Sequence, residues 1–281
     1  YDLSMNEIRN FRQLGSKTAG HPEFGETPGV ETTTGPLGQG FANAVGMAVA
    51  EKILAARFNQ TDLRIVDHYT YVIAGDGCLM EGISHEAASL AGTLQLSKLI
   101  CIYDDNGISI DGEIDGWFTD DTPQRFEAYR WHVQDSVDGH DPAAIKASLI
   151  AAQQDPRPSI ICCKTNIGYG SPNKAGTASS HGNPLGEEEI ALTRENLGWP
   201  YPPFEIPEDV YSVWDCRKKG SEAEIVWQKL LSEYHSKFPA LAAEFERVID
   251  RNLPASWDDE MIQLARQFQK EARTMASRNA S

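Results

Sequence analysis

A glycine-flanked aspartate and a downstream asparagine are the residues of this 281-residue sequence whose types and spacing best suit chemistry. Gly75 and Gly77 permit backbone conformations and a close approach that a side chain would block. Asp76 between them offers a hard oxygen ligand, and Asn106 offers an amide oxygen after the next apolar segment. The four residues together predict a Mg²⁺ ion bound beside a pyrophosphate group.

These residues need elements that bring them to one place. Residues 70–74 and 99–104 are short apolar segments typical of buried strands, and they end at Gly75 and Asp105. The carboxyl ends of adjacent parallel strands lie at one edge of a sheet, where helix N-termini also attract anions. Further strands are predicted over 132–136 and 159–165, and helices over 39–58, 83–94 and 142–154. This alternation predicts an α/β fold, a parallel sheet with helices on both faces.

Loops and a helical extension flank this core. Ser4 and Glu7 form a capping-box pattern that opens a helix with Ile8, Phe11 and Leu14 on one face and Gly15 as its stop. Residues 15–37 and 166–186 are rich in glycine and polar residues, and loops this long are usually functional or disordered. Four prolines in 200–207 mark a boundary, so we expect one domain over 1–199 and an extension over 200–281. Helical spacing in the extension recurs over 222–234, 240–249 and 258–276.

Composition narrows the class of protein. A formal charge of −16 argues against nucleic acid and against an anionic membrane surface, since both favour a basic face. No apolar stretch is long enough to cross a bilayer, and we expect a cytoplasmic protein. The five cysteines lack C-x-x-C spacing and are expected to be buried free thiols.

Several longer motifs carry a family resemblance. They are Gly20-His21-Pro22-Glu23, the run 31–40 (ETTTGPLGQG), the run 76–81, and the loop from Gly168 to His181-Gly182. With Gly75-Asp76-Gly77 and Asn106 they make nearly the whole chain resemble transketolase of the bacterial and plant type. The resemblance implies a thiamine diphosphate-binding fold, with the pyrophosphate-binding domain over 1–199. It also implies that 200–281 leads toward a pyrimidine-binding domain, and that the sequence is a fragment lacking the family's extreme N-terminus and its later domains.

The resemblance assigns a role to each matching residue. Asp76, Asn106 and the Ile108 carbonyl would bind Mg²⁺, for which Ca²⁺ or Mn²⁺ could substitute. The Gly77 amide would bind the pyrophosphate of thiamine diphosphate. The cofactor's aminopyrimidine would be bordered by Gly35, Pro36 and Leu37, and its thiazolium by His21 and His181, the two implied catalytic residues. The family's signature often ends in two asparagines, whereas this chain has Asp105 before Asn106.

The resemblance also implies an activity. Transketolases move a two-carbon ketol unit from a ketose phosphate such as xylulose 5-phosphate to an aldose phosphate such as ribose 5-phosphate or erythrose 4-phosphate. This reaction belongs to the pentose phosphate pathway and is related to the Calvin cycle. The family's activating glutamate comes from the pyrimidine-binding domain across a homodimer interface, so we expect this chain alone to be inactive. The alternatives are a noncatalytic scaffold that binds thiamine diphosphate and a subunit of a split enzyme.

The other histidines and the acidic residues are expected to have mainly structural roles. His85 is explained at least as well by packing of its helix as by a role in function. His68, His132, His140 and His235 are expected to be structural. The acidic run from Asp111 to Asp121 is expected to be a solvated face. Lys164 and Lys174 are the obvious local candidates to bind a sugar phosphate. Glycines 35, 38 and 40 do not form a dinucleotide fingerprint, which disfavours a nicotinamide enzyme.

Overall fold

A computed structural model describes residues 2–279. Their contacts divide them into two compact units. The first comprises the described part of Tyr1–Leu54 together with Asp67–Cys216, and the second comprises Ala55–Val66 with the described part of Arg217–Ser281. The assignment of 1–199 to a pyrophosphate-binding domain stays a prediction. Within residues 2–279, every helix is too short or too polar to span a lipid bilayer.

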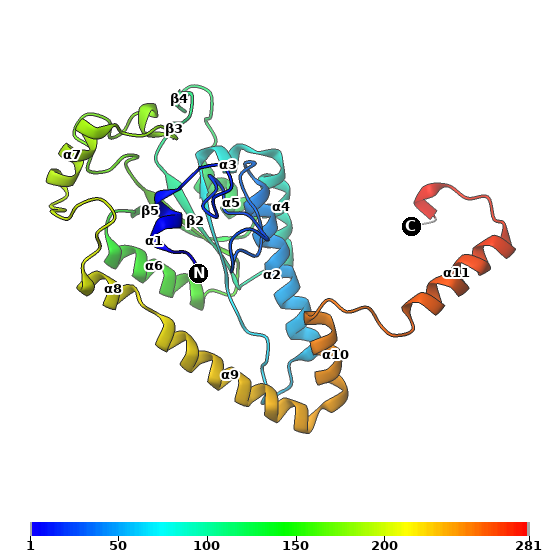
Figure 1. Cartoon of the computed structure of the whole chain (residues 1–281). Coiled ribbons are helices and arrows are strands. Elements are labelled where there is room, and N and C mark those ends of the chain that lie inside the picture. Colours follow the sequence, from blue (N-terminus) through cyan, green and yellow to red (C-terminus); the bar gives the residue numbers. More distant parts are fainter. Residues whose placement is uncertain (1, 280–281) are drawn as a thin grey trace. The chain divides into compact units, whose positions relative to one another are not determined.

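A four-stranded parallel sheet forms the centre of the first unit (Figure 1). Its strand order is β1-β2-β6-β5. Its strands are β1 (Thr70–Gly75), β2 (Leu99–Asp105), β6 (Ser159–Lys164) and β5 (His132–Asp138). Thr70 lies opposite Leu99 and Gly75 opposite Asp104, so β1 and β2 end together at one edge. This is the edge that the sequence predicts for the Asp76 and Asn106 site.

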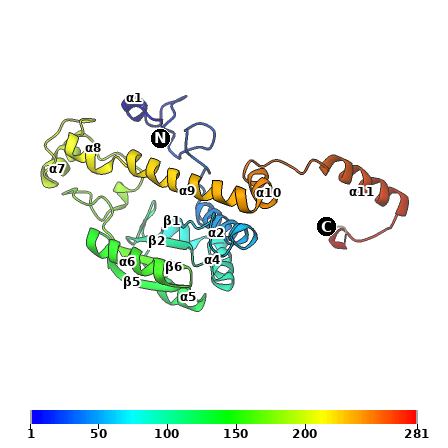
Figure 2. The ribbon, with the colours of Figure 1, turned by 90° about the horizontal axis from the view of Figure 1, so that it is seen from below.

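Helices cover both faces of the sheet, which confirms the predicted fold class (Figure 2). Cys101 and Tyr103 of β2 face one core, and Ile100 and Ile102, which alternate with them, face the other. The first core is completed by α2 (Gln39–Phe58), α4 (Gly82–Leu94) and α5 (Thr122–Ala128), and the second by α6 (Pro142–Gln154). The strands alternate in side-chain direction, so each strand contributes to both cores.

A glycine sets how closely α4 packs in the first core. A methyl group on Gly92 would lie 1.8 Å from the backbone oxygen of Tyr129, so only glycine fits there. Trp131 is buried beside it, and its indole nitrogen donates a hydrogen bond of 2.8 Å to the Ala88 carbonyl. The helix is therefore fixed against the segment that joins α5 to β5.

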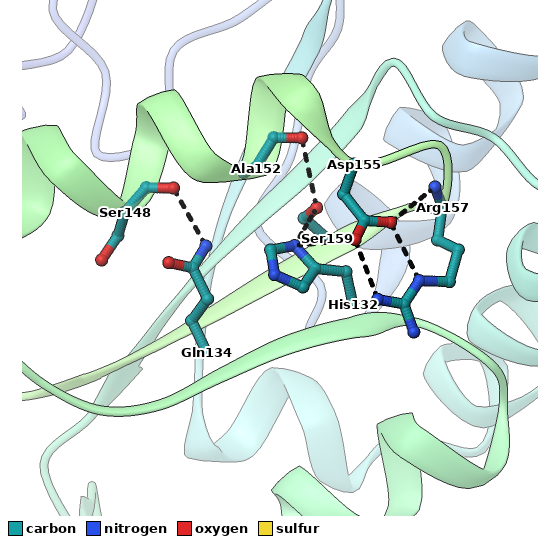
Figure 3. A network of polar contacts seen from close by, with 7 residues as sticks. All are labelled: His132, Gln134, Ser148, Ala152, Asp155, Arg157 and Ser159. Carbon is teal, nitrogen blue, oxygen red and sulfur yellow. Dashed lines mark hydrogen bonds and ion pairs between the residues drawn. The ribbon is translucent and has the colours of Figure 1, made fainter.

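A polar network ties α6 to β5 and β6 (Figure 3). The His132 ring and the Ser159 hydroxyl lie 3.0 Å apart, and Gln134 donates a 2.9 Å hydrogen bond to the Ser148 carbonyl. At the end of α6, Asp155 accepts hydrogen bonds from the Arg157 guanidinium at 2.8 and 2.9 Å. These bonds, chiefly, lower the pKa of Asp155 to about 2. His132 therefore belongs to a network on the covered face of the sheet.

Some elements differ from the sequence-based predictions. The first helix is capped by Ser4 as predicted, but α1 (Met5–Arg9) ends well before Gly15 and buries no residue. It ends early because Arg12 adopts a positive φ of 61° and its backbone nitrogen bonds to the Thr18 carbonyl instead. The elements not predicted are α3 (Asp76–Met80), the hairpin of β3 (Ile108–Ser109) and β4 (Gly112–Glu113), α5, η1 (Ala178–Ser180), α7 (Glu187–Asn196), α8 (Glu208–Trp214) and η2 (Ser277–Asn279).

The second unit is helical. It contains α9 (Arg217–Lys237), α10 (Pro239–Ile249), α11 (Trp257–Glu271) and η2 (Ser277–Asn279), together with the last turn of α2. Phe58 of that turn packs edge-to-face on Phe245, and Tyr234 donates a 2.6 Å hydrogen bond to the Phe58 carbonyl. The three predicted helices are present, although the last ends at Glu271 and not at 276.

All five cysteines are free, as predicted. Cys101, Cys162 and Cys163 are buried and Cys78 is partly buried, but Cys216 is exposed. The prediction of burial was therefore wrong for Cys216. It directly follows α8, which buries no residue.

Candidate functional site

Asp76 lies where β1 passes directly into α3. Gly75 caps this short helix in an extended conformation, so Asp76 opens it and turns back toward β2. The Tyr103 hydroxyl donates a hydrogen bond to one carboxylate oxygen of Asp76, and the Gly107 amide donates to the other at 3.0 Å. Only 2% of the Asp76 surface is exposed. The carboxylate is thus held rigidly from both sides.

No basic residue in the described part of the chain pairs with the charge of Asp76. Burial raises the pKa of Asp76 and nearby Asp105 raises it further, while the hydrogen bonds from Tyr103 and Gly107 lower it. Both hydrogen-bond donors are neutral, and no lysine, arginine or histidine among residues 2–279 forms an ion pair with this carboxylate. A buried carboxylate without a counter-charge is costly, and a bound cation would remove that cost.

Asn106 and Ile108 flank Gly107, whose amide donates a hydrogen bond to Asp76. The Asn106 side-chain oxygen accepts a 2.9 Å hydrogen bond from the Ile108 amide, and its side-chain nitrogen lies 3.4 Å from Asp104. Asp104 is itself held by the Thr165 hydroxyl. The structure therefore brings Asp76, Asn106 and Ile108 together, as the sequence predicts.

The chemistry of this donor set suits a hard cation. Within the described residues no three His, Cys, Asp or Glu side chains gather as a metal cluster. Asp76, Asn106 and Ile108, together called the Asp76 group, offer one carboxylate, one side-chain amide oxygen and one backbone carbonyl oxygen. Mg²⁺ is commonly bound in this way, with one or two carboxylates and with phosphate and water oxygens completing six ligands.

A cavity of about 540 Å³ lies next to this group. Four of the predicted residues line it, namely His21, Gly35, Pro36 and Leu37. Gly35 has a φ of +147°, and a methyl group there would lie 3.1 Å from the His21 ring. Glycine at position 35 therefore lets the imidazole lie flat against the backbone at the cavity wall.

Gly77 joins the cavity to the Asp76 group. It follows Asp76 in α3, and a methyl group on it would lie 3.0 Å from the end of the Leu37 side chain. A side chain at 77 would fill the space between Leu37 and the first turn of α3. The glycine keeps open a cradle that a phosphate group could enter.

His181 is placed apart from these residues. It follows η1 at the end of the long loop, and its Nδ1 atom is buried without a hydrogen-bond partner among residues 2–279. It does not line the cavity that contains His21, and the hydrogen bonds of the described residues do not join it to Asp76. An orphaned buried nitrogen is unusual and fits a group that meets a ligand.

Sequence reasoning missed residues that support the site through hydrogen bonds to its side chains and to nearby backbone. Tyr103 lies inside a predicted strand, and its position on the Asp76 face could have been read from its spacing to Asp105. Arg125 of the unpredicted α5 donates hydrogen bonds to the Leu79 carbonyl and the His85 ring, at 3.0 and 3.1 Å. Because a guanidinium only donates, His85 Nε2 must accept, which fits the packing interpretation of His85.

The two lysines considered for phosphate binding are engaged within the chain. Lys164 forms an ion pair with Asp105, and the Lys174 ammonium donates a 2.8 Å hydrogen bond to the Leu185 carbonyl. The acidic run is exposed as predicted, but Asp121 also caps α5 and Asp120 pairs with Arg125. Neither lysine presents a free cation at the cavity.

Comparison with known proteins gives a consistent result. The family model for the transketolase thiamine diphosphate binding domain matches residues 1–254. Transketolase 2 of Vibrio parahaemolyticus is 59% identical over 281 residues, which are 100% of this chain and 42% of that protein. Transketolase 2 of Escherichia coli is 59% identical over 282 residues, with the same shares. This chain therefore spans less than half the length of these relatives.

Solved structures agree with the sequence relatives. Transketolase from Leishmania mexicana superposes with a TM-score of 0.89 at 47% identity, covering 92% of this chain and 39% of that chain. A Pichia stipitis transketolase in complex with sedoheptulose 7-phosphate gives a TM-score of 0.88 at 43% identity, with the same coverages. The chain belongs to the transketolase family, and residues 1–254 correspond to its thiamine diphosphate binding domain.

Proposed function

We propose that this chain is the pyrophosphate-binding part of a Mg²⁺-dependent transketolase. Such an enzyme transfers a two-carbon ketol unit from a ketose phosphate, such as xylulose 5-phosphate, to an aldose phosphate, such as ribose 5-phosphate or erythrose 4-phosphate. The observation that carries the metal assignment is the buried Asp76 carboxylate, which has only neutral hydrogen-bond donors and lies beside Asn106 and Ile108. The solved complex with a sugar phosphate supports the substrate class.

Most residues of the site would bind the metal ion and the cofactor. Asp76, Asn106 and the Ile108 carbonyl would bind Mg²⁺, and the Gly77 amide would bind pyrophosphate oxygens. When bound, thiamine diphosphate supplies the electron sink for breaking a carbon–carbon bond. Gly35, Pro36 and Leu37 would hold the flat aminopyrimidine against the apolar wall of the cavity.

The two histidines would contact the sugar phosphate substrate. His21 lies at the cavity wall, where its ring would orient the terminal hydroxyl of the donor. His181 would polarise or protonate substrate oxygens, and its unpartnered buried Nδ1 supports such a contact. The longer protein would act as a homodimer in the cytoplasm, with the activating glutamate supplied by the other subunit. This chain alone would then carry half of a site.

The metal assignment is tested by substituting Asp76. In the full natural protein, Asp76→Ala should weaken Mg²⁺ binding more than about 100-fold, since even outer-shell partners of metal ligands are worth about 10- to 100-fold. Calorimetric titration of Mg²⁺ in the presence of thiamine diphosphate measures this. Asp209→Ala, at an exposed aspartate of α8, is the matched control and should bind as the unmodified protein does. Unchanged Mg²⁺ affinity in Asp76→Ala would refute the assignment.

A further inference from the structure

A buried glutamate outside the site described above organises the loop that carries His181. Glu189 lies in the first turn of α7 and only 7% of its surface is exposed, whereas its neighbours Glu187 and Glu188 are exposed. Its carboxylate has no basic partner in an ion pair within the described part of the chain. Such a buried charge needs a structural or functional reason.

Three donors of the loop satisfy this carboxylate. The Ser171 hydroxyl and the Asn173 backbone amide donate to one oxygen, the amide at 2.9 Å, and the Asn173 side-chain amide donates to the other at 2.9 Å. These bonds, chiefly, together with the nearby charge of Lys174, lower the pKa of Glu189 to about 2. Glu189 therefore binds the loop as an ionised group that accepts from both Ser171 and Asn173.

The hydrogen bonds continue from Glu189 to the residue before His181. Ser171 Oγ, which donates to Glu189, accepts the Lys174 amide at 3.2 Å. The Lys174 carbonyl in turn accepts the Ser180 hydroxyl at 2.7 Å. Ser180 directly precedes His181, so an unbroken chain of hydrogen bonds runs from α7 to the backbone that presents the imidazole.

The base of the loop is fixed independently. The Asn166 amide donates a 2.9 Å hydrogen bond to His140, whose ring stacks on Tyr169 with centroids 4.0 Å apart. A methyl group on Gly168 would lie 2.6 Å from the Ser180 hydroxyl, which shows how closely the two ends of the loop pack. With the base fixed, Glu189 is the carboxylate that accepts hydrogen bonds from the middle of the loop, at Ser171 and Asn173.

We infer that Glu189 is a positioning residue, which orders residues 171–181 so that His181 is presented to the sugar substrate. The inference rests on the proposed function for the role of His181, but the ordering itself does not. It assigns to α7 a task in the reaction, although α7 contributes no residue to the cavity or to the Asp76 group.

Amide hydrogen exchange of the full natural protein, without metal or substrate, tests the ordering. Glu189→Gln keeps one acceptor oxygen but places an amide donor opposite the side-chain amide of Asn173, which is also a donor. The amide hydrogen-exchange rates of residues 171–181 should therefore rise at least 10-fold. Glu188→Gln makes the same change of charge one residue away at an exposed position and should leave exchange unchanged. Equal exchange in these two variants would overturn the inference.

A compensating variant separates the specific contact from a general loss of folding. In the double variant Glu189→Gln with Asn173→Asp, the new amide donates to the new carboxylate, so protection over 171–181 should return. If Glu189→Gln lowers protection and the double variant does not restore it, the pairing is not what orders the loop, and the inference fails.

Kinetics test the presentation of His181. Glu189→Gln should lower kcat for ketol transfer at least 10-fold while the Mg²⁺ affinity stays within about two-fold, because the Asp76 group lies outside the loop. Unchanged kcat despite a disordered loop would overturn the role assigned to Glu189. Failure of the metal assignment would appear separately, as normal Mg²⁺ binding in Asp76→Ala.

Discussion

At the scale of single residues, the site depends on side chains that hold the ligands as much as on the ligands. Tyr103 is 3% exposed, and its hydroxyl donates a hydrogen bond to Asp76 from the neighbouring strand. A carboxylate oxygen has two lone pairs. One lone pair can accept the hydrogen bond from Tyr103 while the second lone pair faces a metal ion. Tyr103 then fixes the direction in which Asp76 presents its charge.

Removing that hydroxyl should weaken metal binding without removing a ligand. Tyr103→Phe leaves the ring packing intact and should lower the Mg²⁺ affinity about 10-fold, the lower end of what outer-shell partners of metal ligands contribute. Tyr69→Phe is the control, because that hydroxyl bonds to the Gln153 carbonyl, away from Asp76. Titration calorimetry on both variants gives the comparison, and equal affinities would show that Tyr103 does not orient Asp76.

At the scale of elements, the ends of α6 and β6 are joined by the pair of Asp155 and Arg157 (Figure 3). A carboxylate whose pKa is lower in the folded than in the unfolded protein stabilises the fold at pH values above its pKa in the unfolded protein. That stability is lost as the pH falls through the folded pKa. For Asp155 the window runs from the ordinary value of 3.8 down to about 2.

The pH dependence of stability should reveal this pair. The shift corresponds to roughly 2 kcal/mol, but Arg157 is 45% exposed, so about 1 kcal/mol is expected after solvent screening. Asp155→Asn should therefore lower the free energy of unfolding by about 1 kcal/mol at pH 7, with the difference vanishing toward pH 2. Urea unfolding across pH 2 to 7 measures it, and a difference that stays constant over this range would contradict the assignment.

Local patterns predict the elements of the sheet but not the short helices around it. The strands and α2, α4 and α6 were predictable because their apolar residues recur with a strand or helix period. By contrast, α7 opens with three glutamates, and α5 is a seven-residue helix that directly follows the acidic run, so neither shows an apolar stripe. Asp76 and Asn106 were predictable as neighbours because parallel strands end at one edge. Glu189 was not, because its partners lie in a loop without periodicity.

At the scale of the whole molecule, local sequence could not show that the second unit is discontinuous. Ala55–Val66 joins residues beyond Arg217 through contacts between distant segments, and such contacts leave no local signal. The Asp76 group and the cavity residues all belong to the first unit. This chain covers 42% of the Vibrio parahaemolyticus relative, and we expect segments that correspond to the rest of that protein to complete an active site.

Turnover should therefore depend on the rest of the protein. The 281-residue chain, supplied with Mg²⁺ and thiamine diphosphate, should show negligible ketol transfer and at best weak cofactor affinity. A coupled assay with xylulose 5-phosphate and ribose 5-phosphate measures this, with a full-length transketolase as the positive control. Ordinary turnover by the chain alone would show that it contains a complete site.

The discontinuous second unit has a consequence for biosynthesis. Phe58 and Tyr234, which pack in one core, are separated by 176 residues. Translation at about 5–20 residues per second would delay the arrival of Tyr234 by roughly 9 to 35 s. Phe58 must wait that long on the nascent chain for Tyr234 and Phe245, which contact it in the folded protein. The ribosome-bound intermediate therefore exposes an apolar segment that a chaperone could shield.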